Sequence, residues 1–327
     1  MKTLSIALGC LTLAQMAVAD TPVLDVLTYD GFAAEWGPGP AIEAGFEATC
    51  ACDLRWIMAG DGAAMLARLR LEGASSQADV VVGLDTSLIE AARTSGLFAD
   101  HGLTLPNTLP VAFSDPAFIP FDWGWFAFVH KKTLPNAPKS FEELAASDLK
   151  ILIQDPRSST PGLGLLMWVK AAYGDRAGEI WTALADNIVT VTPGWTEAYG
   201  MFLEGEADMV LSYTTSPAYH LIAESDDSMT AAKFTEGHYL QVEVAGLLVA
   251  SQQPELAREF LIYLGSDAAQ SILPTTNWMY PAMTPAAGLP AAFSTLIQPD
   301  RSLLMTPAEA EAARGPAIAE WQAALTR

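Results

Sequence analysis

The sequence predicts an α/β fold of two lobes that are joined by two strands. Runs of β-forming residues alternate with helical patterns along most of the chain, as in sheets that are covered by helices. Two of these runs, Phe121 to His130 and Tyr239 to Ala250, are longer than the others. They bracket a self-sufficient α/β block. A block that is inserted through two antiparallel crossings is typical of a protein with a hinge between two lobes.

The first nineteen residues predict a secretory signal peptide. One basic residue, Lys2, precedes an apolar run that is too short to span a bilayer, and Ala17-Val18-Ala19 forms a small-x-small cleavage site. The alternative is a lipoprotein anchored through Cys10, but the residues before this cysteine are a poor context for lipidation. We therefore expect residues 1–19 to be removed from an exported protein.

Eight later segments are rich in the β-branched and aromatic residues of strands. They are Val23 to Tyr29, Asp53 to Met58, Asp79 to Gly83, Trp123 to His130, Ile151 to Gln154, Ile188 to Val191, Met209 to Tyr213 and Tyr239 to Ala250. Helices are expected between them. Ligands of such sheets bind where the carboxyl ends of strands face a crevice, so the residues that follow these strands are candidates for a site.

Three helix starts are predicted from capping residues. Ser140 followed by Glu143 forms a capping box, and Pro254 suits the first turn of a helix. Thr306 with Glu309 opens a terminal helix that runs to about Leu325. We expect residues 20–124 and 244–327, with this terminal helix, to form the first lobe. Residues 125–243 are expected to form the second.

The charge of the chain and its lack of enzyme motifs exclude several functions. It has 17 basic and 38 acidic residues, a formal net charge of −21, which disfavours nucleic acid and anionic membrane surfaces as partners. No phosphate-binding loop, dinucleotide fingerprint, zinc motif or nucleophile elbow is present. The four histidines, His101, His130, His220 and His238, lack the spacing of metal ligands. We expect a monomer without catalytic activity, metal or cofactor.

Two cysteines follow the signal peptide, Cys50 and Cys52, with one residue between them. In an oxidising compartment this pair either closes a small local disulfide or stays as two thiols, and the sequence leaves both open.

Aromatic residues accumulate at the ends of the predicted strands and in the loops near them. Each of them has packing in the core as its alternative role, but several at the carboxyl ends of different strands indicate a shared site. They are Tyr29, Trp36, Trp195, Tyr213, Tyr219 and the Trp278-Met279-Tyr280 segment.

Two polar segments are further candidates for ligand contacts. Ser158 to Gly164 supplies hydroxyls and free backbone N–H groups before a helix of Leu165 to Ala172, an arrangement that binds anions such as phosphate. Asp61-Gly62 lies in a strand-to-helix turn, where the carboxylate can accept a hydrogen bond from an amino group or face a cation. A plain helix cap is the alternative for both segments.

Five parts of the chain together resemble a known family. They are Leu27-Thr28-Tyr29-Asp30 with Trp36-Gly37-Pro38-Gly39-Pro40, Ala78 to Asp85, Gln154 to Gly164, Ser212 to His220, and Asn277 to Pro281. The sequence is similar in these parts to thiamine-binding periplasmic proteins, the substrate-binding subunits of bacterial thiamine ABC importers. The resemblance implies a type II periplasmic-binding-protein fold and a periplasmic location. It also implies thiamine, its monophosphate or its diphosphate as ligand, and membrane permease and ATPase subunits as partners.

The resemblance also implies which residues contact the ligand. They are Asp61, Gly62, Ser159, Thr160, Trp195, Tyr213, Thr214, Thr215 and Ser216, with Tyr29, Trp36, Tyr219 and Trp278 as further residues that line the cleft. Two alternatives exist within the same fold. A ferric binder typically presents adjacent tyrosines, and this chain has no Tyr-Tyr pair. A thiaminase-like transferase needs an activated cysteine, whereas Cys50 and Cys52 are expected at the end of the sheet opposite the cleft.

Overall fold

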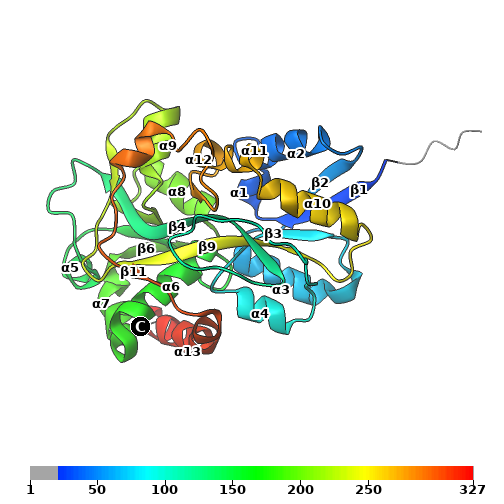
Figure 1. The fold of residues 1–327 in the computed structure, drawn as a ribbon. Coiled ribbons are helices and arrows are strands. Elements are labelled where there is room, and N and C mark those ends of the chain that lie inside the picture. Colours follow the sequence, from blue (N-terminus) through cyan, green and yellow to red (C-terminus); the bar gives the residue numbers. More distant parts are fainter. Residues whose placement is uncertain (1–20, 327) are drawn as a thin grey trace, which may run out of the picture.

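The computed structural model describes residues 21–326 (Figure 1). The predicted signal peptide, residues 1–19, and Cys10 therefore lie outside the described residues. Within residues 21–326, none of the helices combines the length and the apolar character that a membrane-spanning helix needs.

A mixed sheet runs through the molecule in the order β2-β1-β3-β9-β4-β7-β5-β6, and three short strands pair at its sides. The main strands are β1 (Val23–Thr28), β2 (Asp53–Met58), β3 (Val80–Asp85), β4 (Phe118–Lys131), β5 (Ile151–Gln154), β6 (Ile188–Thr192), β7 (Met209–Tyr213) and β9 (His238–Leu247). The short strands are β8 (Met229–Ala231), β10 (Tyr280–Pro281) and β11 (Ser302–Leu303). All eight predicted strands are present, with shifted ends in several cases.

The two long strands connect the two halves of the sheet. β4 pairs with β9 from Phe118 to Trp125 and then with β7 from Phe126 to His130, antiparallel in both cases. β9 pairs on its other side with β3, also antiparallel. The pairs β1–β2, β1–β3, β5–β6 and β5–β7 within the two halves are parallel. The prediction of two long antiparallel crossings is confirmed, while the lobe boundaries themselves stay a prediction.

Helices cover both faces of each half of the sheet (Figure 1). They are α1 (Asp30–Ala33), α2 (Gly39–Glu47), α3 (Gly62–Glu72), α4 (Ile89–Thr94), α5 (Phe141–Ala145), α6 (Thr160–Tyr173), α7 (Ala177–Leu184), α8 (Trp195–Leu203), α9 (Pro217–Ala223), α10 (Pro254–Leu264), α11 (Asp267–Gln270), α12 (Leu273–Thr276) and α13 (Pro307–Leu325). Alternate residues of β3 point to opposite faces: Val80 and Val82 pack in the core under α2 and α10, and Val81 packs in the core with α3.

The predicted helix starts are confirmed, with one change. Ser140 accepts a hydrogen bond from the Glu143 backbone N–H, and Thr306 and Glu309 form a full capping box at α13. Helix α6 begins at Thr160 and not at Leu165 as predicted, because Ser159 is its N-cap and Pro161 lies in its first turn.

The terminal helix α13 packs mainly on α6 and α7 and also contacts α4 (Figure 1). Trp321 on α13 is buried in the same core as Trp168 of α6, and the Lys170 ammonium of α6 lies 3.0 Å from the Glu320 carboxylate. We expected this helix to group with residues 20–124. It contacts elements of both predicted lobes, α6 and α7 of residues 125–243 and α4 of residues 20–124. The lobe to which it belongs therefore stays a prediction.

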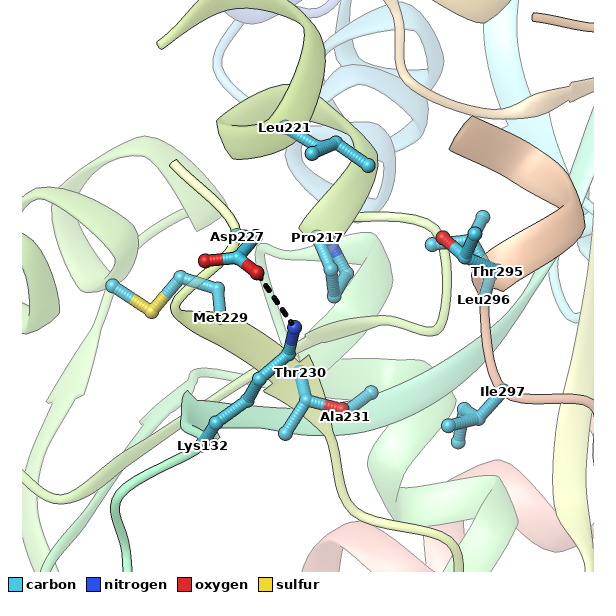
Figure 2. Close-up of a pocket in the computed structure, with 10 residues that line it drawn as sticks. All are labelled: Lys132, Pro217, Leu221, Asp227, Met229, Thr230, Ala231, Thr295, Leu296 and Ile297. Carbon is cyan, nitrogen blue, oxygen red and sulfur yellow. Dashed lines mark ion pairs between the residues drawn. The ribbon is translucent and has the colours of Figure 1, made fainter. Parts of the chain in front are cut away.

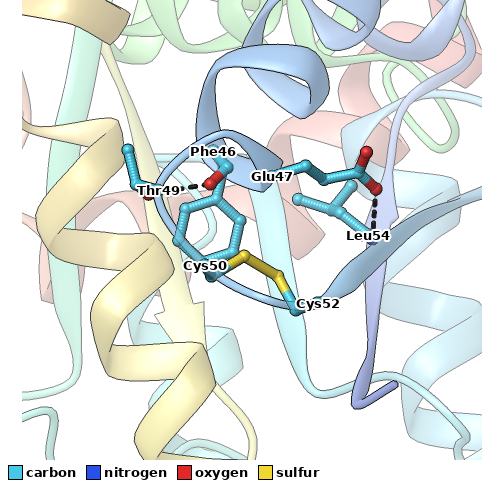
Figure 3. The surroundings of a disulfide bond; sticks show 6 residues. All are labelled: Phe46, Glu47, Thr49, Cys50, Cys52 and Leu54. Atoms are coloured by element: carbon cyan, nitrogen blue, oxygen red, sulfur yellow. Dashed lines mark hydrogen bonds between the residues drawn. A yellow bond between two sulfur atoms is a disulfide. The ribbon is translucent and has the colours of Figure 1, made fainter. Parts of the chain in front are cut away.

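The two cysteines form a disulfide between the end of α2 and the start of β2 (Figure 3). Their Cα atoms are 5.3 Å apart. Glu47, just before them, accepts a hydrogen bond from the Leu54 backbone N–H at 2.8 Å and fixes the same turn. The disulfide therefore lies at the amino-terminal end of β2, while the ends of the parallel strands that face the candidate site are at the other end.

Candidate functional site

Two helix N-termini from different halves of the sheet meet at the centre of the molecule. Asp61 caps α3 by accepting a hydrogen bond from the Gly62 N–H at 2.7 Å. Ser159 caps α6, and its Oγ donates a hydrogen bond to Asp61 Oδ2 at 2.7 Å. Burial raises the pKa of the Asp61 carboxyl, while the hydrogen bonds from Ser159 and Gly62 act in the opposite direction. The predicted residues Asp61, Gly62, Ser159 and Thr160 thus form one contact.

Glycine is required at position 62 by this close approach. A Cβ atom there would lie 2.1 Å from Thr160 Oγ1 and 3.2 Å from the Gly83 carbonyl oxygen. Such distances are far below van der Waals contact, so a side chain at position 62 would push α3 away from α6.

Two threonine hydroxyls near this contact and at the end of β7 have no protein partner. Thr160 Oγ1 and Thr214 Oγ1 are both buried, and neither has a hydrogen-bond partner among the described residues. Buried hydroxyls are nearly always hydrogen-bonded in folded proteins. Thr214 Oγ1 is therefore available to a ligand, and Thr160 Oγ1 has only the nearby Asp61 carboxyl group to interact with.

The end of β7 orients the next predicted residues. Trp195, the first residue of α8, donates a hydrogen bond from its indole N–H to Ser212 Oγ at 2.8 Å, and Ser212 Oγ lies 2.7 Å from Ser216 Oγ. Ser216 Oγ also accepts from the Tyr213 N–H at 3.2 Å. Thr215 contacts the Met279 sulfur at 3.7 Å. This hydrogen-bonded chain links the Trp195 ring to the turn of residues 213–216.

The aromatic residues meet across the two halves of the chain. Trp36 and Trp195 have ring centroids 6.4 Å apart, and Tyr219 and Trp278 lie edge to face at 5.3 Å. Trp36 is 53% exposed, which places it at a rim and not in a core. Trp278 has a φ of +58°, a conformation that costs energy for a bulky residue and is found most often at functional sites.

Tyr29 and Tyr213 lie deeper and hydrogen-bond to residues of the connecting strands. The Tyr29 ring covers Gly83, where a Cβ atom would lie 2.3 Å from the ring. Its hydroxyl is 3.0 Å from Glu243 Oε2. The Tyr213 hydroxyl donates to Gln241 Oε1 at 2.9 Å. The structure therefore brings all the predicted site residues into one region, and the aromatic cluster is a tertiary feature.

The sequence-based reasoning missed three acidic residues beneath these tyrosines. Asp85 of β3, Glu243 of β9 and Asp122 of β4 are direct neighbours in the strand register, Asp85 opposite Glu243 and Glu243 opposite Asp122. Directly opposite residues lie on the same face of a sheet with Cβ atoms about 5 Å apart. We call these three residues the acid row. The only signal in the sequence is an isolated acid within each apolar strand.

Burial and mutual repulsion favour the protonated forms of the acid row. Burial raises the pKa of Asp85 to about 7 and that of Asp122 to about 7. Burial, with the nearby Asp122 carboxylate second, raises the pKa of Glu243 well above its usual value. Glu243 accepts hydrogen bonds from the Tyr29 hydroxyl and from Gln241 Nε2. The Asn277 Nδ2 donates to Asp122 Oδ2 at 2.6 Å.

The acid row predicts that the ligand-free protein loses stability as pH rises. A carboxyl group with a higher pKa in the folded than in the unfolded state destabilises the folded protein once it is ionised. The free energy of unfolding should therefore fall as the pH rises from 5 to 8. Replacement of Asp85 with asparagine should raise the free energy of unfolding at pH 8 by about 1–4 kcal/mol, since each unit of pKa shift corresponds to about 1.4 kcal/mol. Urea unfolding of the wild type and of Asp85→Asn at pH 5 and pH 8 measures these changes, with Asp175→Asn as a control at an exposed position. A wild type equally stable at both would contradict it.

Two cavities of the structure lie away from this region. One of about 90 Å³ lies beside α9 and β8 and is crossed by an ion pair between Lys132 and Asp227 at 3.8 Å (Figure 2). The other, of about 220 Å³, lies between α3, α6 and α13. Both are smaller than the about 300–1,000 Å³ of common ligand pockets, and none of the predicted site residues lines them. They do not mark the candidate site.

Comparison with known proteins places the chain in a family. Residues 42–276 match the family described as bacterial extracellular solute-binding protein. The thiamine-binding periplasmic protein of Salmonella typhimurium is 54% identical over 94% of each chain. That of Escherichia coli K12 is 51% identical over 97% of this chain and 99% of its own.

A solved structure of a periplasmic thiamin binding protein matches with a TM-score of 0.92 and 52% identity, over 94% of this chain and 97% of the other. Solved iron-binding proteins share only the fold, at 20% identity or less. The family resemblance and the predicted fold are thereby confirmed: this chain belongs to the thiamine-binding periplasmic proteins, a family of bacterial solute-binding components of ABC transport.

Proposed function

We propose that this chain binds thiamine, thiamine monophosphate or thiamine diphosphate between its two lobes in the periplasm and delivers it to the permease and ATPase subunits of an ABC importer. The observation that carries the proposal is the aromatic cluster above the acid row. Thiamine joins a permanently charged thiazolium to an aminopyrimidine, so it presents two flat rings and a cation. Aromatic faces and carboxyl groups are the protein groups that recognise such a molecule.

The two rings have suitable partners on both lobes. Trp36 belongs to residues 20–124 and Trp195 to residues 125–243, and their ring centroids are 6.4 Å apart. Tyr219 and Trp278 form a second pair. Tyr29 and Tyr213 lie between these pairs and the acid row, because their hydroxyls bond to Glu243 and Gln241. The aromatic residues therefore supply the walls of the site, and the connecting strands supply its floor.

A phosphate group, where the ligand carries one, is proposed to bind at the N-terminus of α6. Ser159 Oγ donates to Asp61 at 2.7 Å, whereas Thr160 Oγ1 is buried near Asp61 without a partner at hydrogen-bond distance, so Thr160 is the hydroxyl that can turn to a phosphate oxygen. The backbone N–H groups at the start of this helix favour an anion as well. Thr214, Thr215 and Ser216 are proposed to complete the polar side of the site.

We further propose that the protein acts without catalysis and without a metal or other cofactor. Cys50 and Cys52 are joined as a disulfide at the far end of β2, so neither presents a thiolate to the cleft. Among residues 21–326, no group of three or more His, Cys, Asp or Glu side chains is arranged to hold a metal ion. Both facts favour a carrier of an organic solute.

Calorimetric titration tests the proposed function directly. We expect one site that saturates with thiamine, and with at least one of its phosphate esters, and no saturable heat with ferric citrate. The relative affinities of the three thiamine forms then report how much the phosphate contributes at Thr160, since a charge-assisted hydrogen bond contributes about 1.5–3 kcal/mol. Absence of saturable binding for all three forms would contradict the proposal.

A further inference from the structure

The acid row lies on the two strands that connect the lobes, β4 and β9, and on the end of the neighbouring β3, beside the site residue Tyr29. Asp85, Glu243 and Asp122 belong to three neighbouring strands and share one face of the sheet. The exposed fraction of Glu243 is 5%, and Asp85 and Asp122 are fully buried. The hydroxyl of Tyr29, a predicted site residue, is in contact with Glu243. The row is therefore the innermost polar layer of the proposed site.

The row has more acceptor atoms than the protein satisfies. The Oδ1 of Asp122 is buried without a hydrogen-bond partner among the described residues, and Asp85, also without a partner at hydrogen-bond distance, has only the neutral N–H and hydroxyl of Ser87 close to its carboxyl group. None of the ion pairs among residues 21–326 involves Asp85, Asp122 or Glu243. Unpaired buried carboxylates are costly, so these atoms need either protons or a cation.

The groups that face the row from the surrounding elements bring no positive charge. Asp61 lies before α3, Tyr29 after β1 and Tyr213 at the end of β7, and each of them interacts electrostatically with Glu243. The side chains of Gln241 and Asn277 are neutral donors to Glu243 and Asp122. Three carboxyl groups with a fourth, Asp61, nearby cannot all ionise in a cleft without a counterion.

We propose that the acid row is a proton-exchanging counterion: in the empty cleft it holds a proton, and an organic cation that binds above it replaces that proton. The O–H bond of one carboxyl group breaks, the proton passes to the solvent, and the resulting carboxylate balances the charge of the bound cation. The ligand itself is not changed. This inference rests on the proposed function, because thiamine supplies the cation.

An organic cation fits the row better than a metal ion. Gln241 and Tyr29 already donate hydrogen bonds to the two oxygens of Glu243, which leaves fewer lone pairs for direct coordination of a metal ion. A larger organic cation needs no such coordination bond. The ring of Tyr29, which covers Gly83, and that of Tyr213 add flat π-faces beside the carboxyl groups. A ring that carries a delocalised charge makes use of both.

The number of protons released on binding tests the proposal. Thiamine is titrated into the full protein at pH 7 in phosphate and in Tris, whose ionisation enthalpies differ, so the heat difference counts protons. We expect release that approaches about one proton per thiamine. Affinity should rise with pH by up to about tenfold per unit and level off at about pH 8, measured above the range in which the aminopyrimidine takes up a proton.

Substitutions localise the effect to the row. Glu243→Gln keeps the size of the side chain and one acceptor oxygen but has no carboxyl proton to exchange. It should lower the number of protons released and weaken binding at pH 8 by at least about tenfold. Glu206→Gln, the same change at an exposed position, should leave both unchanged. Asp122→Asn offers a second variant if Glu243→Gln fails to fold. The number of protons released by the wild type tests the proposal even if neither variant folds.

The possible outcomes separate this inference from the proposed function. If the wild type does not bind thiamine, the function proposed above is wrong. If it binds thiamine tightly without releasing protons, and Glu243→Gln binds as well as the wild type at pH 8, then the acid row is a structural feature and the inference is wrong.

Discussion

Replacement of Gly62 with alanine is expected to weaken thiamine binding by about ten- to hundredfold. The added Cβ atom would lie 2.1 Å from Thr160 Oγ1 and 3.2 Å from the Gly83 carbonyl oxygen. Either α3 moves away from α6 and the cleft stays partly open, or Thr160 rotates and its hydroxyl leaves the site. Overpacking of this kind costs about 1–3 kcal/mol, which corresponds to the stated loss.

Two further variants show whether the clash causes the loss. Gly178 lies in α7 with open space where a Cβ would be, so Gly178→Ala should bind as the wild type does. Adding Thr160→Ala to Gly62→Ala removes the nearest atom and should restore most of the lost affinity for unphosphorylated thiamine. A Gly62→Ala protein that binds thiamine like the wild type would show that the α3–α6 contact does not support binding.

Replacement of Trp195 with alanine is expected to weaken thiamine binding by one to two decades. The centroid of its ring lies 6.4 Å from that of Trp36, and the ring is held by stacking on Tyr199 at 4.8 Å and by its hydrogen bond to Ser212. A cation over a desolvated aromatic ring contributes about 2 kcal/mol, and ring stacking adds about 0.5–1.5 kcal/mol. Fluorescence or calorimetric titration with thiamine measures the change, and circular dichroism confirms folding.

A conservative variant separates the ring from its hydrogen bond. Trp195→Phe keeps an aromatic face but loses the indole N–H that reaches Ser212, so it should lose less affinity than Trp195→Ala if ring contact dominates. Leu71→Ala, at a side chain that is 88% exposed on α3, is the control for a large-to-small change at the surface. A folded Trp195→Ala protein with wild-type affinity would return this residue to a role in packing.

Several features of this protein depend on residues close together in the chain, and these could be predicted from the sequence. The caps at Ser140 and Thr306 involve residues three positions apart, and the strands Ile151–Gln154 and Met209–Tyr213 match their predicted bounds. Hydrogen bonds within one turn and the alternation of side chains along a strand are local properties. The aromatic residues at strand ends were predicted for the same reason, because a strand that ends at a crevice brings its next residue there.

Other features depend on which distant residues become neighbours. The acid row exists because β3, β9 and β4 pair in one register, and a shift of one residue in that register would move Glu243 to the opposite face of the sheet. The contact between Gly62 and Thr160 arises from two helices about a hundred positions apart, and the sequence contains no local sign of it. The location of α13 on α6 and α7 is likewise a tertiary feature: Trp321 shares a core with Trp168, and the residue pattern along a helix does not specify the element on which it packs.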